Sequence, residues 1–170
     1  MVPARGLGVG RRPRTGALFP PARQAPGMSF DVTAARVAHV VFAAAWTGST
    51  LAVALFVVPA ARRGVLAAAP VEWIADRFTK LSVASVVVML LTGGHLAGTL
   101  YTFEALANSS RGHLVVGMTG LWLVLAGLAH VATSRLTGTA DVQRAADDAT
   151  PWFAAASAVS VALLVLAGLL

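Results

Sequence analysis

Four long apolar stretches, separated by short polar segments, set the pattern of this 170-residue chain. The first runs from Val37 to Ala60, with Arg36 before it and Arg62-Arg63 after it. At ~1.5 Å per residue, a helix of that length crosses a ~30 Å hydrocarbon layer. The same reasoning predicts spans at about 33–60, 80–101, 113–134 and 151–170. The expected fold is therefore all-α, a bundle of four transmembrane helices.

The segments between the spans carry signals for where each helix begins and ends. Pro59 together with Gly64 is expected to end the first helix. Residues 65–76 are too short to span, and Trp73 favours a piece that lies at the membrane interface. Residues 101–112 are expected to form a polar connection. Thr150-Pro151 is the pattern of a cap residue followed by proline at the first helical position, which predicts the start of the fourth helix.

The composition is typical of a membrane protein, and it limits the kinds of bonds and metal ligands that the chain can form. The chain is 57% hydrophobic and 12% charged, with a mean hydropathy of +0.76, whereas soluble domains carry about 25% charged residues. We expect a single multi-pass domain over 28–170 whose partner is the lipid bilayer of the cell membrane. The absence of cysteine excludes disulfides and thiolate metal sites. A metal would need His, Met or carboxylate ligands.

The net charge of +6 does not indicate a nucleic-acid partner, because the basic residues lie in the N-terminal tail and at helix ends. Residues 1–27 contain five Arg, five Pro, five Gly and no acidic residue, a composition that predicts disorder. The alternative is that translation begins at Met28. The loops after the first and third spans carry six basic residues in total: Arg62, Arg63, Arg77, Lys80, Arg135 and Arg144. By the positive-inside rule these loops are cytoplasmic and both termini lie outside.

This topology places three of the four histidines at one membrane level. His39, His95 and His113 fall in the outer third on three different helices, whereas His130 belongs to the cytoplasmic end, where packing or an interfacial position is expected. At 100° per residue, Thr92, His95 and Thr99 share one face of the second helix, which should point into the bundle. Intramembrane ionisable residues are commonly functional. The alternative is an ordinary buried histidine that bonds a neighbouring threonine or carbonyl.

The ligand that such a cluster would hold is left open by the residues themselves. Imidazole suits copper and zinc, and paired imidazoles also hold haem iron. Met89 and Met118 offer the thioethers that Cu(I) prefers, although methionine in apolar helices is usually a gap filler. Small-residue seams such as Ala44-x3-Gly48-x3-Ala52 predict close helix packing. These seams leave open a homo-oligomer or a larger membrane partner.

A run of positions in the first two spans resembles the copper-resistance D (CopD) family. The residues are His39-x6-Trp46-x-Gly48, Pro59 before a basic pair, Arg77-Phe78-x-x-Leu81 and Thr92-Gly93. The resemblance covers about Ala35 to Ser134 and implies a four-helix core that takes up or handles copper. The HemJ-type protoporphyrinogen oxidases also open with His and Trp in the first helix. Ser49 stands where CopD proteins have a second glycine, and Met118 stands near a position where both groups tend to carry lysine.

The leading functional expectation is a CopD-like membrane protein that binds or transports copper at the outer histidine cluster, with no catalytic residue. His39, His95 and His113 are the expected ligands, with Met89 and Met118 as further candidates. Trp46, Gly48, Thr92 and Thr99 are expected to give packing or polar support. The alternatives are a haem-binding redox protein or protoporphyrinogen oxidase, and a small structural subunit.

Overall fold

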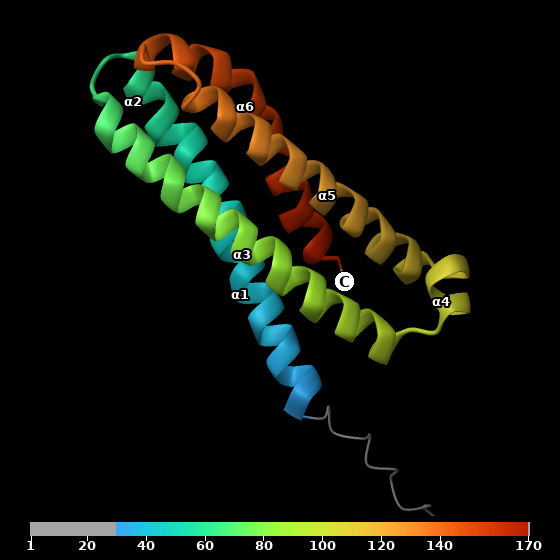
Figure 1. The fold of residues 1–170 in the computed structure, drawn as a ribbon. Coiled ribbons are helices and arrows are strands. Elements are labelled where there is room, and N and C mark those ends of the chain that lie inside the picture. The colour runs from blue at the N-terminus through green and yellow to red at the C-terminus, as the bar shows by residue number, and fades with distance from the viewer. Residues whose placement is uncertain (1–29, 170) are drawn as a thin grey trace, which may run out of the picture.

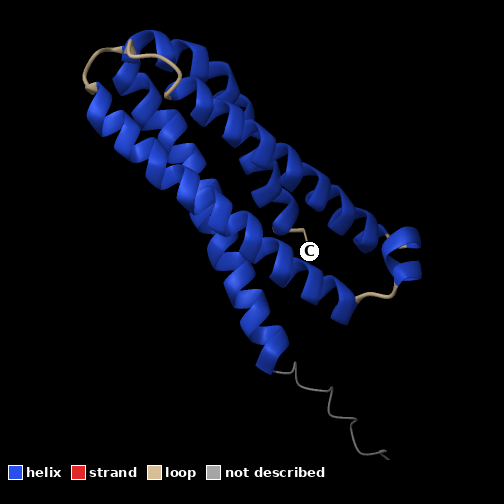
Figure 2. Ribbon diagram, in the orientation of Figure 1, coloured by secondary structure: helices blue, strands red, loops and turns tan. Residues whose placement is uncertain are grey.

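The computed structural model describes residues 30–169, and its regular structure over that range is entirely helical (Figure 2). The first span, Phe30–Arg62, consists of α1 (Phe30–Ala52), a π-helical turn η1 (Val53–Val57) and α2 (Val58–Arg62). The later helices are α3 (Ala68–Leu100), α4 (Phe103–Asn108), α5 (Ser110–Leu136) and α6 (Val142–Ala167). The prediction for residues 1–27 lies outside the described residues.

Four helices in the described part of the chain are long and apolar enough to cross a membrane: Phe30–Arg62, Ala68–Leu100, Ser110–Leu136 and Val142–Ala167. This confirms the predicted four-span, all-α fold. At ~1.5 Å per residue, the 33 residues of α3 extend about 50 Å. Since the hydrocarbon layer is ~30 Å thick, the ends of α3 reach into the headgroup regions.

The first span packs against α3 through α1 and against α6 through α1, η1 and α2, and α6 also packs closely against α5. Figure 1 shows α1 beside α3 and α5 beside α6, and α3 makes its weaker contact with α5. The core contains Trp46, Leu125 and Phe153, each no more than 1% exposed. The rings of Phe78 on α3 and Phe153 on α6 lie with their centroids 6.0 Å apart. Large side chains on the outer faces, such as Leu90, are exposed on the bundle, as expected of a surface that lipid covers.

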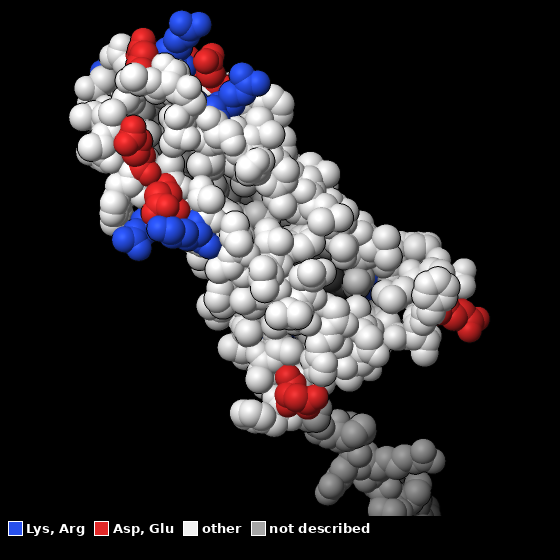
Figure 3. Space-filling model, in the orientation of Figure 1, with Lys and Arg blue, Asp and Glu red and all other residues white. Residues whose placement is uncertain are grey.

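Charged side chains gather at one end of the bundle, and the wall below that end is almost free of them (Figure 3). We call this the basic end; it is formed by α2, the start of α3, the end of α5 and the start of α6. We call the opposite end, which holds His39, His95 and His113, the histidine end. The band between the two ends is the part of the molecule that matches a bilayer interior.

Helix α6 begins at Val142, earlier than the Thr150-Pro151 start that the sequence pattern indicated. The cap is Asp141, whose side chain accepts hydrogen bonds from the backbone N–H groups of Gln143 (3.1 Å) and Arg144 (3.2 Å). Pro151 lies inside the helix, and the Thr150 hydroxyl donates to the Ala146 carbonyl at 2.7 Å. An Asp cap stabilises an earlier start, and packing of the following turns holds the helix together through the proline.

Two other segments between the spans also differ from expectation. Most of the predicted interfacial piece at 65–76 belongs to α3, which starts at Ala68. Trp73 is nevertheless exposed, and the Arg77 guanidinium lies 5.4 Å from the centre of its ring. The polar connection at 101–112 contains the short helix α4. Thr102 caps α4 and Ser109 caps α5, each accepting a backbone N–H.

The first span changes its winding immediately before Pro59. In η1 the Val58 N–H donates to the carbonyl of Val53, five residues back. Proline cannot donate a hydrogen bond and its ring crowds the carbonyl four residues earlier. A wider turn at this place accommodates that loss, since single π-turns inside α-helices are the usual form of this irregularity.

Candidate functional site

His39 on α1 is joined to Thr92 on α3 by a hydrogen bond of 2.9 Å between Nδ1 and Oγ1. The Thr92 hydroxyl donates its proton to the Val88 carbonyl at 2.7 Å. Thr92 therefore accepts at His39, and the ring hydrogen is on Nδ1. In the neutral ring this tautomer leaves the lone pair on Nε2. The threonine thus orients the imidazole and keeps one nitrogen available to a ligand.

Gly93 makes room for this ring. A side chain built at Gly93 would bring its Cβ to 3.1 Å from His39 Cε1, tighter than ordinary van der Waals contact. The Thr92-Gly93 pair therefore supplies both the hydrogen-bond partner and the space for the partly buried imidazole. This explains in physical terms why the two residues stand together on α3.

His95 lies on the same α1–α3 seam, nearer the end of the bundle. Its Nε2 is 3.4 Å from an Asp31 carboxylate oxygen, and both side chains are substantially exposed. Thr99 is also exposed, and its hydroxyl donates to the His95 backbone carbonyl at 2.7 Å. The stripe therefore meets α1 at Thr92 through His39 and at His95 through Asp31, whereas the Thr99 hydroxyl bonds within its own helix.

His113 belongs to a different part of the histidine end. Its Nε2 lies 2.8 Å from the Ala107 carbonyl oxygen of α4, so this nitrogen donates and the ring folds back onto the connection before α5. Gly112 beside it is buried, and a Cβ there would overlap the Ala105 carbonyl oxygen. The tight α4–α5 junction thus fixes where His113 can reach.

Within residues 30–169, no group of three or more His, Cys, Asp or Glu side chains is placed to hold a metal ion. His39 and His95 share one seam, and His113 is held against α4. Met89 lies one turn from Thr92 along α3, and both Met89 and Met118 are partly buried against the core. The ligand roles predicted for these five residues stay predictions.

The other expected supporting residues differ in what they touch. Trp46 is 1% exposed, and its indole N–H donates to the Ser82 hydroxyl at 3.0 Å, which links α1 to α3. Gly48, in contrast, is exposed, and a side chain there would meet nothing within 4 Å. Within this chain Trp46 ties two helices together, whereas Gly48 makes no close approach. The role of Gly48 toward a partner stays a prediction.

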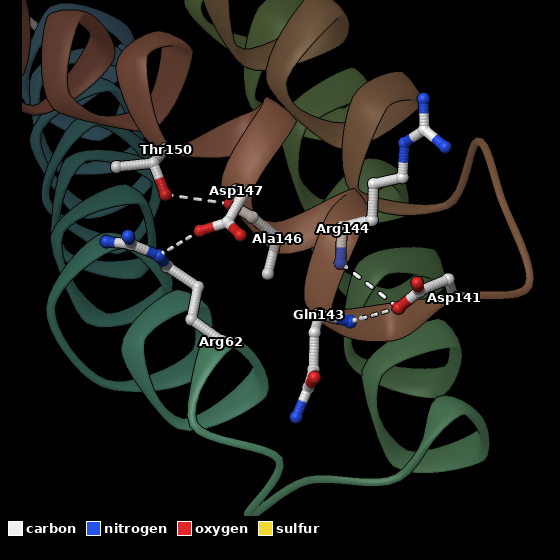
Figure 4. Close-up of polar contacts among 7 residues, drawn as sticks. All are labelled: Arg62, Asp141, Gln143, Arg144, Ala146, Asp147 and Thr150. Carbon is white, nitrogen blue, oxygen red and sulfur yellow. Dashed lines mark hydrogen bonds and ion pairs between the residues drawn. The ribbon is translucent and has the colours of Figure 1, made fainter.

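The basic end contains a tie between the first and last spans that the sequence pattern did not reveal. Arg62 Nε donates to Asp147 Oδ1 at 2.5 Å, joining α2 to α6 beside the capped start of α6 (Figure 4). Both side chains are about half exposed. A recess of about 350 Å³ opens here, lined by Pro59, Arg62, Arg63 and Asp147. The sequence indicates this ion pair only in that Arg62 and Asp147 carry opposite charges and lie in two loops predicted at the same end of the bundle.

A groove of about 310 Å³ lies between α3 and α5, with Trp46 on its wall. It opens near the basic end and is lined mainly by aliphatic side chains and by hydroxyls. His130, for which packing or an interfacial position was expected, lies exposed on the α5 side of this groove. The fourth histidine is therefore accessible from the membrane-facing side of the bundle.

Four buried polar atoms within residues 30–169 have no hydrogen-bond partner. They are the hydroxyls of Ser85, Ser157 and Ser160 and the indole nitrogen of Trp122. Ser85 follows Phe78 by seven residues, and Ser160 follows Phe153 by seven, so both lie two turns beyond the contact between these two tilted rings. Because α3 and α6 run in the same direction (Figure 1), the two serines occupy the same level of the core.

Comparison with known protein families gives one match. The family described as "Copper resistance protein D" (CopD) matches residues 72–170, which span α3 to α6 and more than half of the chain. No curated protein and no solved structure gives a significant match. The matched range includes His95, His113 and His130, whereas His39 and Trp46 precede it.

Proposed function

This chain belongs to the copper resistance protein D family, and from that premise we propose that it binds copper at the histidine end and passes it across the cell membrane. The observation that carries the proposal is the Thr92-oriented imidazole of His39, which holds Nε2 available on a seam between two spanning helices. Imidazole nitrogen is a ligand that copper accepts readily.

The remaining ligands we propose are His95 and Met89, with His113 and Met118 further away. His95 lies three residues beyond Thr92 on α3, and its exposed side chain lies on the α1–α3 seam that also holds His39. Met89 lies three residues before Thr92, on the side toward the membrane interior, and provides the thioether that suits Cu(I). A site with so few ligands favours transient occupation, which suits a cargo ion that must also leave.

The proposed direction follows from charge. The six basic residues at the basic end are cytoplasmic by the positive-inside rule, so the histidine end faces outward. Copper would then meet His39 and His95 first. Further into the bundle, the polar groups along α3 that copper would contact are hydroxyls and the Met89 thioether.

The test is a Cu(I) titration of the purified protein against a chromogenic chelator. His39→Asn keeps a side-chain N–H that can donate to Thr92 but lacks the Nε2 ligand, so combined with His95→Ala it should abolish copper binding. His130→Ala, at the other end, serves as the matched control and should bind like the wild type. Unchanged copper stoichiometry in the double variant contradicts the proposal.

The same preparation distinguishes the alternatives. A Soret absorption band in the purified protein would support the haem-binding redox protein or protoporphyrinogen oxidase instead. Full activity in cells with all four histidines changed to alanine would support a structural subunit. Copper analysis and the absorption spectrum together therefore separate the three functions.

A further inference from the structure

The groove between α3 and α5 has a mixed lining that is suited to one kind of ligand. Its α3 side is formed by Thr79, Ser82, Val83, Val86 and Val87. Its α5 side is formed by Ala126, Ala129, His130, Thr133, Ser134 and Thr137, and Trp46 completes it. From Thr79 to Val87 the groove extends about 12 Å along α3, from the basic end toward the middle of the bundle. The hydroxyls concentrate at the basic end and the valines lie deeper.

Most of the hydroxyls in this groove already donate within their own helices. Thr79 donates to Ala75 at 2.8 Å, Thr133 to Ala129 at 2.8 Å and Ser134 to His130 at 2.9 Å. Thr137 likewise donates to Thr133 at 3.1 Å. Their protons are therefore not offered to a ligand.

Ser82 and His130 are the exceptions, and they stand on opposite sides of the groove. Ser82 accepts the indole N–H of Trp46 at 3.0 Å, so its own proton must point elsewhere, and among residues 30–169 no side chain or carbonyl accepts it. The His130 ring makes no hydrogen bond within the described range. The groove thus offers one donor from α3 and one from α5.

The ligand that fits is neutral, because none of the twelve lining residues is an aspartate, glutamate, lysine or arginine. The cations nearest to this part of α3 are already engaged: Lys80 pairs with Asp76 at 2.7 Å, and Arg77 lies over Trp73. A phosphate or carboxylate would enter without a counter-charge, which is costly away from water. A neutral head with hydrogen-bond acceptors avoids that cost.

We infer that this groove binds the head of a neutral, membrane-soluble amphiphile with hydrogen-bond acceptors on two opposite edges, the chemistry of an isoprenoid quinone. Ser82 Oγ–H donates to one carbonyl and a His130 ring N–H to the other, while the valines cover the ring. A volume of about 310 Å³ is at the lower end for ligand pockets and suits a single substituted ring. The groove opens between two helices toward the bilayer, where the tail remains. This inference is independent of the copper proposal.

The experiment uses the full chain in lipid nanodiscs, titrated with a decyl-substituted 1,4-benzoquinone and followed by quenching of tryptophan fluorescence. We expect saturable binding of one quinone per chain. Ser82→Ala and His130→Leu should each weaken the affinity about tenfold, the effect of losing one hydrogen bond. His113→Leu, a histidine change at the other end, should leave the affinity unchanged.

A second ligand separates recognition from simple apolar partition. Decylbenzene has the same tail and ring but no carbonyls, so it should bind more weakly and be insensitive to both variants. His130→Leu is decisive if Ser82→Ala fails to fold, since His130 is exposed. Equal affinity for decylbenzene, unchanged affinity in His130→Leu, or displacement of the quinone by an anionic phospholipid would each overturn the inference.

Discussion

The hydrogen bond between Trp46 and Ser82 should be a measurable link between α1 and α3. We consider three variants: Trp46→Phe, Ser82→Ala and the two combined. The first removes the donor but keeps an aromatic ring in a site that is 1% exposed, and the second removes the acceptor. The combined variant removes both, so no buried polar group is left without its partner.

The magnitudes follow from burial. Ser82→Ala leaves a buried indole N–H unpaired, which costs about 1–3 kcal/mol. Trp46→Phe loses ring volume in a packed core and should cost about 1–2 kcal/mol, well below the ~3–5 kcal/mol expected for truncation to alanine. Side-chain hydrogen bonds between membrane helices contribute about 0.6 kcal/mol on average and about 1.7 at most. The double variant should therefore be less destabilised than the sum of the single variants by an amount in that range.

Reversible unfolding in mixed micelles with increasing dodecyl sulfate, followed by circular dichroism, gives each free energy of unfolding. A double-mutant cycle then isolates the coupling energy between the two residues. A coupling energy indistinguishable from zero would refute the reasoning, because it would mean that the indole N–H and the Ser82 hydroxyl do not stabilise each other in the bundle.

Four further substitutions test local features of the fold by thermal unfolding in one detergent. Gly112→Ala should lower the free energy of unfolding by about 1–3 kcal/mol because the new methyl overlaps the Ala105 carbonyl. Gly48→Ala places its methyl in open space, so it should be neutral or raise the free energy of unfolding by up to about 1 kcal/mol. Equal effects of the two substitutions would contradict this reasoning. Asp141→Ala should cost about 1 kcal/mol through loss of the α6 cap, and no loss would argue for a start at Pro151. Asp147→Asn should cost less than about 1 kcal/mol because its pair is half exposed, and a larger loss would show that the tie is stronger than its exposure implies.

The four spans could be predicted from sequence because the signal is local: an apolar run of sufficient length must be helical in a bilayer. The start of α6 could not, since a Thr-Pro pair has the same pattern at a helix start and inside a helix. What decides is whether an earlier residue caps the chain, and Asp141 does so with two backbone N–H groups.

The sequence could predict those features of the site that depend only on which face of a helix a residue occupies. Azimuth indicated that Thr92 points into the bundle, and it does contact His39. Azimuth does not indicate how far two helices remain in contact, so it did not show that His95 faces Asp31 at the open end of the seam. The same limit applies to the glycines. Spacing shows which ones share a face, but Gly94, Gly98, Gly117, Gly120 and Gly127 all face space without a neighbour within 4 Å.

The π-turn before Pro59 keeps the core residues on either side of it on the same face of the first span. Core positions on this helix run Trp46, Thr50, Val53 and then Val58, a step of five where an α-helix allows three or four. In α geometry, the additional residue would rotate everything after it by about 100°, and Arg62 would turn away from Asp147. The wider turn cancels that rotation. A chain shortened by one residue within Val53–Val57 would therefore regain a regular helix and still present the same faces to α6.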